Sequence, residues 1–172
     1  MGKRSDFARN PRDFYPTPEA AVLPLLRHVS RGDTFIEPCA GDGALVRHLE
    51  KHGLHCAGQY DIEPQAPGIV AQGYASLRAC GADWIITNPP WDRKLLHPMI
   101  EHFRVLAPTW LLFDASWPFT KQSATLMQYC HAIVPIGRVK WIPNSKMTGK
   151  DDCAWYLFDH AMPKHGTRFY GR

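Results

Sequence analysis

The chain of 172 residues lacks several features that would place it in common classes. It has no run of about 20 consecutive apolar residues, the length that a transmembrane helix requires, and no signal-peptide pattern. Its five cysteines show no C-x-x-C spacing and its nine histidines no ligand-like pairing, so we expect neither a disulfide framework nor a metal site. We therefore expect a cytoplasmic protein without a membrane partner.

A glycine turn between Phe35 and Leu45 lacks the marks of two common nucleotide sites. The segment reads F-I-E-P-C-A-G-D-G-A-L and predicts a strand, a tight turn and a helix. Val46 replaces the third glycine of a dinucleotide fingerprint, and no Gly-Lys-Ser/Thr follows, so NAD and P-loop sites are not favoured. Glu37 and Asp42 would repel a pyrophosphate and suit a cofactor with positive charge and free hydroxyls. A plain strand–turn–helix without a ligand is the alternative.

Asp61 ends the next expected strand, over residues 56–61. It follows the glycine turn by about 20 residues, the spacing typical of an acid that binds ribose hydroxyls. A solvated aspartate at a strand end is the alternative interpretation.

The tetrapeptide Asn88-Pro89-Pro90-Trp91 follows an apolar strand over residues 84–87. Neither proline can donate to a sheet, so the strand must end there, at the edge where open α/β sheets bind ligands. The Asn88 amide oxygen and the Pro89 carbonyl would be two fixed acceptors for the hydrogens of an exocyclic amine. Trp91 could stack on a flat heterocycle. A turn opener followed by a packing tryptophan is the structural alternative.

Strand and helix patterns alternate along the chain, which predicts an α/β fold. Expected helices cover residues 18–28, 43–53, 93–107 and 119–130, and expected strands residues 33–38, 56–61, 83–88, 109–114, 133–136, 139–142 and 153–158. This order favours a Rossmann-like, mostly parallel sheet with helices on both faces and an antiparallel C-terminal edge hairpin. We expect residues 1–172 to form a single catalytic domain, without room for a separate target-recognition domain.

Taken together, these motifs resemble those of the class I S-adenosylmethionine-dependent amino-methyltransferases, most closely the DNA adenine-N6 methyltransferases, including small phage-type ones. Four motifs match in order: residues 13–18 (D-F-Y-P-T-P), residues 37–43, Asp61, and residues 88–91. The first is similar to the segment that closes over the methionine end of the cofactor. The resemblance implies a class I methyltransferase fold, S-adenosylmethionine as the cofactor, and a cytoplasmic enzyme of a bacterium or a phage-infected host.

The resemblance also implies a set of site residues. Cofactor contacts are expected from Tyr15, Pro16, Thr17, Glu37, Pro38, Cys39, Ala40, Gly41, Gly43, Asp61, Ile62 and Asn88. Catalysis is expected from Asn88, Pro89, Pro90 and Trp91, with methyl transfer to the N6 amine of an adenine that is flipped out of DNA and stacked on Trp91.

One departure from the family concerns the cofactor's adenine ring. No clear acidic residue precedes the catalytic strand; residues 74–77 stand where one is expected, and Asp83 is too close to the start of the strand. Other substrates stay open as well. A relative that methylates RNA or a protein glutamine would also need two amine acceptors, although tyrosine is frequent at the fourth position in protein-modifying relatives. A non-catalytic nucleic-acid-binding module is the remaining alternative.

The net charge of +4 and the pI near 8.9 fit a nucleic-acid partner without requiring one. A long polar loop over residues 143–152 carries Lys146 and Lys150, which we expect to contact DNA. The basic N-terminal arm, over residues 3–12, is a second candidate. A chain of this size reads DNA through loops, through a partner subunit, or hardly at all, which leaves a homodimer open.

Overall fold

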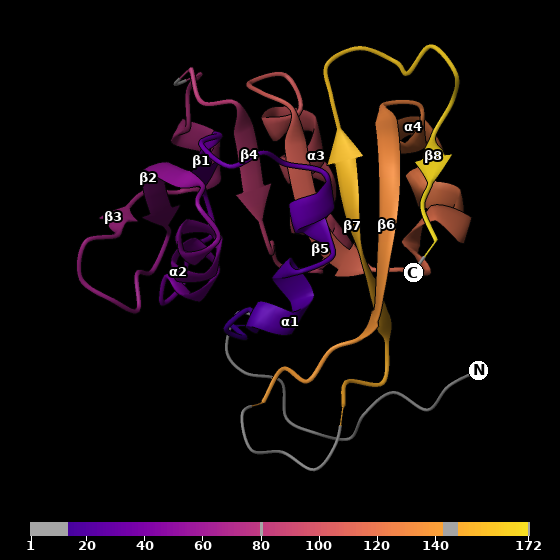
Figure 1. Cartoon of the computed structure of the whole chain (residues 1–172). Helices are drawn as coiled ribbons and strands as arrows, with labels where there is room; N and C mark the ends of the chain where they lie inside the picture. Colours follow the sequence, from indigo (N-terminus) through magenta and orange to yellow (C-terminus); the bar gives the residue numbers. More distant parts are fainter. Residues whose placement is uncertain (1–13, 80, 143–147, 172) are drawn as a thin grey trace.

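A computed structural model describes residues 14–79, 81–142 and 148–171. In these residues, eight strands form one sheet in the order β3-β2-β1-β4-β5-β7-β6-β8 (Figure 1). The strands are β1 (Thr34–Glu37), β2 (His55–Asp61), β3 (Val70–Ala71), β4 (Trp84–Thr87), β5 (Thr109–Asp114), β6 (Cys130–Arg138), β7 (Asp152–Phe158) and β8 (Arg168–Phe169). The Rossmann-like arrangement expected from the sequence is confirmed.

Helices cover both faces of the sheet (Figure 1). The α-helices are α1 (Glu19–Val22), α2 (Ala44–Lys51), α3 (Arg93–Phe103) and α4 (Ala124–Met127), and the 3-10 turns are η2 (Leu25–Arg27), η3 (Tyr74–Ser76), η4 (Trp117–Phe119) and η5 (Lys121–Ser123). α1 and α2 bury apolar side chains such as Leu45 and Leu49 in one core cluster. α3 and α4 bury Ile100, Phe103 and Leu126 in the other cluster. None of the described helices is long and apolar enough to cross a membrane.

Two of the expected helices are wrong in extent. The helix expected over residues 18–28 ends at Val22 and is followed by η2, because Pro24 has no N–H to continue the ladder. The helix expected over residues 119–130 divides into η4, η5 and α4, with Thr120 in an extended conformation between the two 3-10 turns. Both regions therefore contain short helical pieces rather than one regular helix.

The two strands expected over residues 133–136 and 139–142 are also corrected. A single strand, β6, ends at Arg138, and residues 139–142 lie beyond it. Pro135 does not end this strand, because the pairing with β7 shifts register between Pro135 and Gly137 and accommodates the missing donor. The short strands β3 and β8 were not expected; each has only two residues and therefore no measurable period.

The strand directions bring several chain segments to one edge. β1, β2, β4 and β5 run parallel, and β7 is antiparallel to both β5 and β6, so the expected antiparallel hairpin is confirmed, with β6 in place of residues 139–142 as its first strand. β6 consequently runs in the same direction as β5. The carboxyl ends of five strands thus meet at one edge, and the segment between β6 and β7 extends beyond it (Figure 1).

Candidate active site

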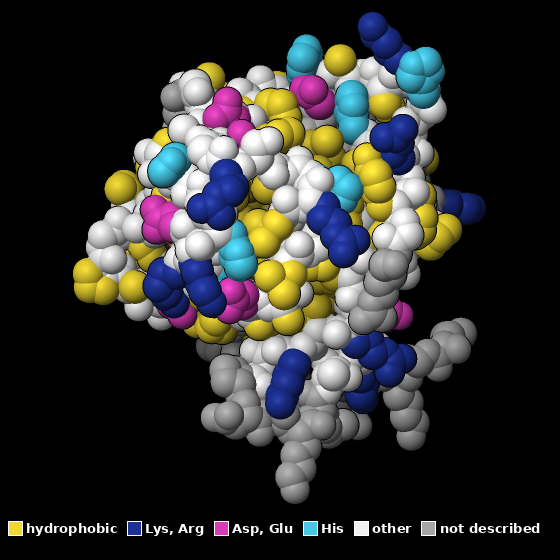
Figure 2. Space-filling view, viewed as in Figure 1, with side chains coloured by type: hydrophobic (Ala, Val, Ile, Leu, Met, Phe, Trp, Pro, Cys, Tyr) yellow, Lys and Arg dark blue, Asp and Glu magenta, His cyan; other side chains and the backbone are white. Residues whose placement is uncertain are grey.

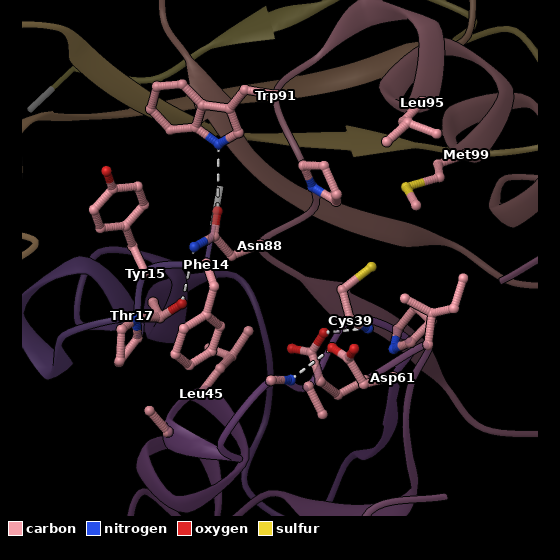
Figure 3. Close-up of a pocket in the computed structure, with 18 of the residues that line it drawn as sticks. Phe14, Tyr15, Thr17, Cys39, Leu45, Asp61, Asn88, Trp91, Leu95 and Met99 are labelled. Carbon is pink, nitrogen blue, oxygen red and sulfur yellow. Dashed lines mark hydrogen bonds between the residues drawn. The ribbon is translucent and has the colours of Figure 1, made fainter. Parts of the chain in front are cut away.

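A cleft of about 1880 Å³ opens at this carboxyl edge. A polar residue at or just after the end of each of the five strands lines it: Glu37, Asp61, Asn88, Asp114 and Arg138. Single small-molecule sites usually occupy about 300–1,000 Å³, so the cleft has room for two ligands side by side. Figure 3 shows Asp61 and Cys39 in one part of the cleft and Asn88 with Trp91 in another.

The glycine turn is held by the residues around it. Gly41 has a φ of 56° and donates its N–H to Asp61 Oδ2 at 2.8 Å. A Cβ atom at position 41 would lie only 2.5 Å from Cε2 of Phe14. Glycine is therefore required both for the left-handed backbone and for the close approach of the N-terminal segment to the turn.

Glu37 is the most unusual titratable group of the site. Its side chain is only 1% exposed; Oε1 accepts a hydrogen bond from the Cys39 N–H at 3.0 Å, and Oε2 has no partner among the described residues. Burial raises the pKa of Glu37 to about 8, and the nearby Thr87 hydroxyl and Cys39 N–H oppose that shift only in part. The unpartnered oxygen is thus suited to a cationic or hydrogen-bond-donating ligand.

We expect Glu37→Gln to change how the stability of the ligand-free protein depends on pH. The folded-state pKa of about 8 lies above the ordinary 4.5, so the stability that protonated Glu37 contributes is complete below pH 4.5 and is lost as the pH rises to about 8. Within that window this group lowers the free energy of unfolding by up to about 1.4 kcal/mol per pH unit.

Urea unfolding of both proteins across this pH range measures the difference. Glu37→Gln should gain stability relative to the wild type as the pH rises. Glu50→Gln, at an exposed position on α2, is the matched control and should follow the wild type. Parallel curves for all three proteins would show that Glu37 is already ionised in the folded state.

Asp61 is fixed at the tip of β2 by two backbone donors. Oδ2 accepts from Gly41 and Oδ1 accepts from the Glu63 N–H, both at 2.8 Å. Each carboxylate oxygen can accept a second hydrogen bond, and the residue lines the cleft. The neighbouring Ile62 lines the cleft and is 72% exposed, so it offers an apolar surface beside the carboxylate.

The Asn88 carboxamide is oriented by contacts at both ends. Its Nδ2 donates to Thr17 Oγ1 at 3.1 Å, and its Oδ1 accepts a long bond of 3.4 Å from the Trp91 indole N–H (Figure 3). An indole N–H can only donate, so the amide oxygen must face Trp91 and the amide nitrogen must face Thr17. The orientation therefore points the acceptor of Asn88 toward the side of the cleft where Trp91 lies.

Trp91 makes a further contact that was not expected. Its ring packs edge-on against Trp141, with centroids 5.9 Å apart and planes at 82°. Trp141 lies in the segment that extends from β6, and the Gly149 N–H there donates to the Val139 carbonyl at 2.8 Å. Trp141 belongs to the strand expected over residues 139–142, which does not form. The part of the chain between Arg138 and Asp152, which we call the β6–β7 extension, is thus in contact with the tetrapeptide through Trp141.

Most of the expected site residues come together in the cleft. Its lining includes Tyr15, Pro16, Thr17, Glu37, Pro38, Cys39, Ala40, Gly41, Asp61, Ile62, Asn88, Pro90, Trp91 and Lys150. Pro89 is buried and does not line it. Gly43 lines a small neighbouring cavity of about 210 Å³ instead. Lys146 and the basic N-terminal arm lie outside the described residues.

Cys39 and Asp83 do not supply a nucleophile or a cleft carboxylate. Burial raises the pKa of the Cys39 thiol, so it is not a ready nucleophile. Asp83 lies at the opposite edge, where its Oδ2 accepts from the N–H and the hydroxyl of Thr34 at 2.8 and 2.7 Å. Among the described residues, no three His, Cys, Asp or Glu side chains are grouped so that they could hold a metal ion.

A second set of residues that line the cleft was not expected from the sequence. The cleft is also lined by Tyr74, Arg93, Leu95, Met99, Asp114 and Arg138. Tyr74, Leu95 and Met99 add apolar surface (Figure 3 shows the last two), while Arg93 and Arg138 add positive charge. These residues belong to segments far apart in the chain, and no local motif marks them.

Comparison with solved structures identifies the fold. A protein assigned as an RNA methyltransferase from Pyrococcus horikoshii superposes with a TM-score of 0.60 at 17% identity, over 90% of this chain and 91% of its own. A protein assigned as a class I S-adenosylmethionine-dependent methyltransferase from Listeria monocytogenes gives 0.57 at 12% identity, over 87% and 61%. A dimethyladenosine transferase from Plasmodium falciparum gives 0.53 at 12% identity, over 88% and 63%.

No protein-family model matches the sequence, and no curated protein sequence is detectably similar to it. At identities of 12% to 17%, the structural likeness establishes architecture. The chain has the Rossmann-like fold of the class I methyltransferases.

Proposed function

We propose that this protein transfers a methyl group from S-adenosylmethionine to the exocyclic N6 amine of adenine in DNA. The observation that carries the proposal is the Asn88 carboxamide, whose oxygen is oriented at the carboxyl end of β4. It lies in the same cleft as the buried Glu37 and the fixed Asp61. A cleft with room for two ligands allows a cofactor and a base to bind next to one another.

The residues on one side of the cleft fit S-adenosylmethionine, which supplies an electrophilic methyl group on a sulfonium. The unpartnered Oε2 of Glu37 suits the ammonium of the methionine part. The Asp61 carboxylate suits the ribose hydroxyls, and Ile62 and Tyr74 offer apolar surface to the adenine ring. Phe14 and Thr17 of the N-terminal segment line the same cleft and would cover the methionine end. No acidic residue is needed at the adenine ring in this arrangement.

The tetrapeptide would hold the target amine for reaction. The nitrogen lone pair of adenine is conjugated with the ring, so the free amine is a poor nucleophile. Acceptance of one of its hydrogens by Asn88 Oδ1 would favour a pyramidal nitrogen with its lone pair turned toward the cofactor side; the Pro89 carbonyl, expected as the second acceptor, belongs to a residue that does not line the cleft. Such positioning can contribute up to about 7–11 kcal/mol. The same amide oxygen would stabilise positive charge as it develops on the nitrogen.

Aromatic and basic side chains support a nucleic-acid substrate. An adenine inside a duplex cannot reach the cleft, so it would be flipped out and packed against Trp91, which Trp141 supports from the side. Arg138, Lys140 and Lys150 are exposed along the β6–β7 extension, where Figure 2 shows dark blue side chains below the sheet. We propose that Lys150 and Lys146 contact phosphates there. A homodimer would add a second such surface.

RNA is the second candidate substrate. Two of the superposed structures are assigned as an RNA methyltransferase and a dimethyladenosine transferase, and a flipped adenine presents the same amine in RNA. A protein glutamine also presents an –NH2 group, but it offers no flat ring to Trp91. DNA is preferred because the four motifs resemble those of DNA adenine-N6 methyltransferases.

Transfer of tritium from S-[methyl-³H]adenosylmethionine to duplex DNA, single-stranded DNA, RNA and protein tests the proposal. Labelled acceptors are digested, and the methylated nucleoside is identified by mass spectrometry. N6-methyldeoxyadenosine as the main product supports the proposal, whereas label confined to RNA or protein would replace DNA with that acceptor. Calorimetric titration without S-adenosylmethionine binding would favour the non-catalytic module.

A further inference from the structure

Phe119 has the largest exposed fraction of any large apolar side chain in the described part of the chain, at 87%. It ends η4, which closely follows Asp114 at the carboxyl edge of the sheet. Asp114 lines the cleft, so the turn that carries Phe119 begins at the same edge at which the cleft opens. A phenylalanine that remains in water gains none of the free energy that burial of its ring would give, and a docking partner would supply that burial.

The backbone that presents Phe119 is fixed rather than loose. We call residues 116–123 the Phe119 turn. The preceding Trp117 is 2% exposed, and its indole N–H donates to His97 Nε2 at 3.0 Å. The buried Ser123 hydroxyl lies within hydrogen-bonding distance of the Pro118 and Thr120 carbonyls, at 3.0 and 2.7 Å. The backbone that carries the exposed ring is therefore fixed before any partner binds.

The side chains around Phe119 are positively charged. Lys121 lies in the turn, and Arg93 and Lys94 lie in the first turn of α3; all three are exposed. Arg93 donates to Gln122 Oε1 at 3.2 Å, which connects the Phe119 turn to a residue of the cleft. Positive charge in the first turn of a helix is disfavoured by the helix dipole, so these cations do not serve the stability of α3.

The nearby carboxylates leave these cations available. Asp92 Oδ1 accepts from the Lys94 backbone N–H, and both Asp114 oxygens accept from Ser116. Among the described residues, the salt bridges that form involve neither Arg93 nor Lys94 nor Lys121. The surface thus combines one exposed aromatic ring with three cations that form no salt bridge within the described part of the chain.

We propose that Phe119 inserts into the base stack of duplex DNA beside the flipped adenine, while Lys121, Arg93 and Lys94 contact the adjoining phosphates. The inference rests on the proposed function and extends it to how the duplex is opened. Flipping leaves a gap between base pairs, and an apolar side chain that enters a base step offsets the lost stacking. The charge of the surface favours this occupant over a second copy of a chain that is itself basic.

Phe119→Ala tests the inference, with Phe169→Ala as the matched control. Phe169 is also a strongly exposed phenylalanine, at 68%, but it pairs with Ile133 near the amino end of β6, at the opposite edge of the sheet. Each protein is assayed on a short duplex with an adenine that the wild type methylates, and on the same duplex with that adenine mispaired. Binding to both duplexes is measured by fluorescence anisotropy.

We expect Phe119→Ala to lower kcat/KM on the paired duplex by roughly 10-fold or more, the scale of losing one aromatic–base contact. The defect should shrink on the mispaired duplex, whose adenine opens more easily. Phe169→Ala should match the wild type on both. An equal defect on both duplexes, or none on the paired one, overturns the inference.

Two further outcomes separate the inference from the proposed function. If the wild type binds duplex DNA through Phe119 but transfers no methyl group to it, only the proposed function fails. If the wild type neither binds nor methylates DNA, both fail. A shift from dimer to monomer in Phe119→Ala by light scattering would assign the surface to a second copy and overturn the DNA contact.

Discussion

Replacement of Asn88 by alanine should slow methyl transfer by about 10²–10³-fold, the usual effect of removing one preorganised polar group from a transition state. The variant loses Oδ1, the oriented acceptor, but it retains Glu37 and Asp61 in the cofactor part of the cleft. Single-turnover rates with saturating S-adenosylmethionine measure the effect. The dissociation constant of the cofactor should change little.

Gln128→Ala is the control, because it removes an exposed carboxamide at the end of α4, where its Nε2 donates only to the Thr125 carbonyl. It should have the wild-type rate and melting temperature. A comparable rate for Asn88→Ala would contradict the role assigned to the tetrapeptide. Thr17→Val tests the orientation argument separately, since it keeps Asn88 and removes the acceptor for Nδ2.

The fold was predictable because strong local signals agree with one another. Apolar strands over residues 84–87 and 109–114 end in a double proline and in Asp114, and both end where expected. Two errors lie in expected helices: Pro24 interrupts the first, and the extended backbone of Thr120 divides the region of the second. Further errors lie in strands of two residues, which have no detectable period and form only because a neighbouring strand offers its edge.

That Glu37, Gly41 and Asp61 would line one cleft was predictable for a related reason. Glu37 and Asp61 end strands β1 and β2, Gly41 follows β1 in a short motif, and sheet topology alone brings such positions together. The part of the cleft near Trp91 depends on pairing between strands that are far apart in the sequence. Arg138 and Asp114 meet in the cleft only because β7 enters the sheet between β5 and β6, and Trp141 reaches Trp91 only because the β6–β7 segment extends past the edge. No spacing in the sequence encodes those contacts.

The N-terminal segment connects the two parts of the cleft. Phe14 packs on Gly41 in the glycine turn, and Thr17 accepts a hydrogen bond from the amide of Asn88 in the tetrapeptide. These positions are only three residues apart, so a shift of the segment that alters one contact should alter the other. One short stretch of chain therefore contacts both the glycine turn and the Asn88 amide.

Asp61→Ala should weaken S-adenosylmethionine binding by about 1.5–3 kcal/mol, which corresponds to roughly 10- to 100-fold, because it removes a charged acceptor for the ribose hydroxyls. It also removes the carboxylate that accepts from the Gly41 and Glu63 N–H groups, so the glycine turn loses part of its support. Asp83→Ala is the matched control: its carboxylate also accepts from a backbone N–H at 2.8 Å, but at the opposite edge of the sheet. Calorimetry should show a loss of affinity for Asp61→Ala alone, even where both variants lose stability. An unchanged dissociation constant for Asp61→Ala would remove the ribose from the tip of β2.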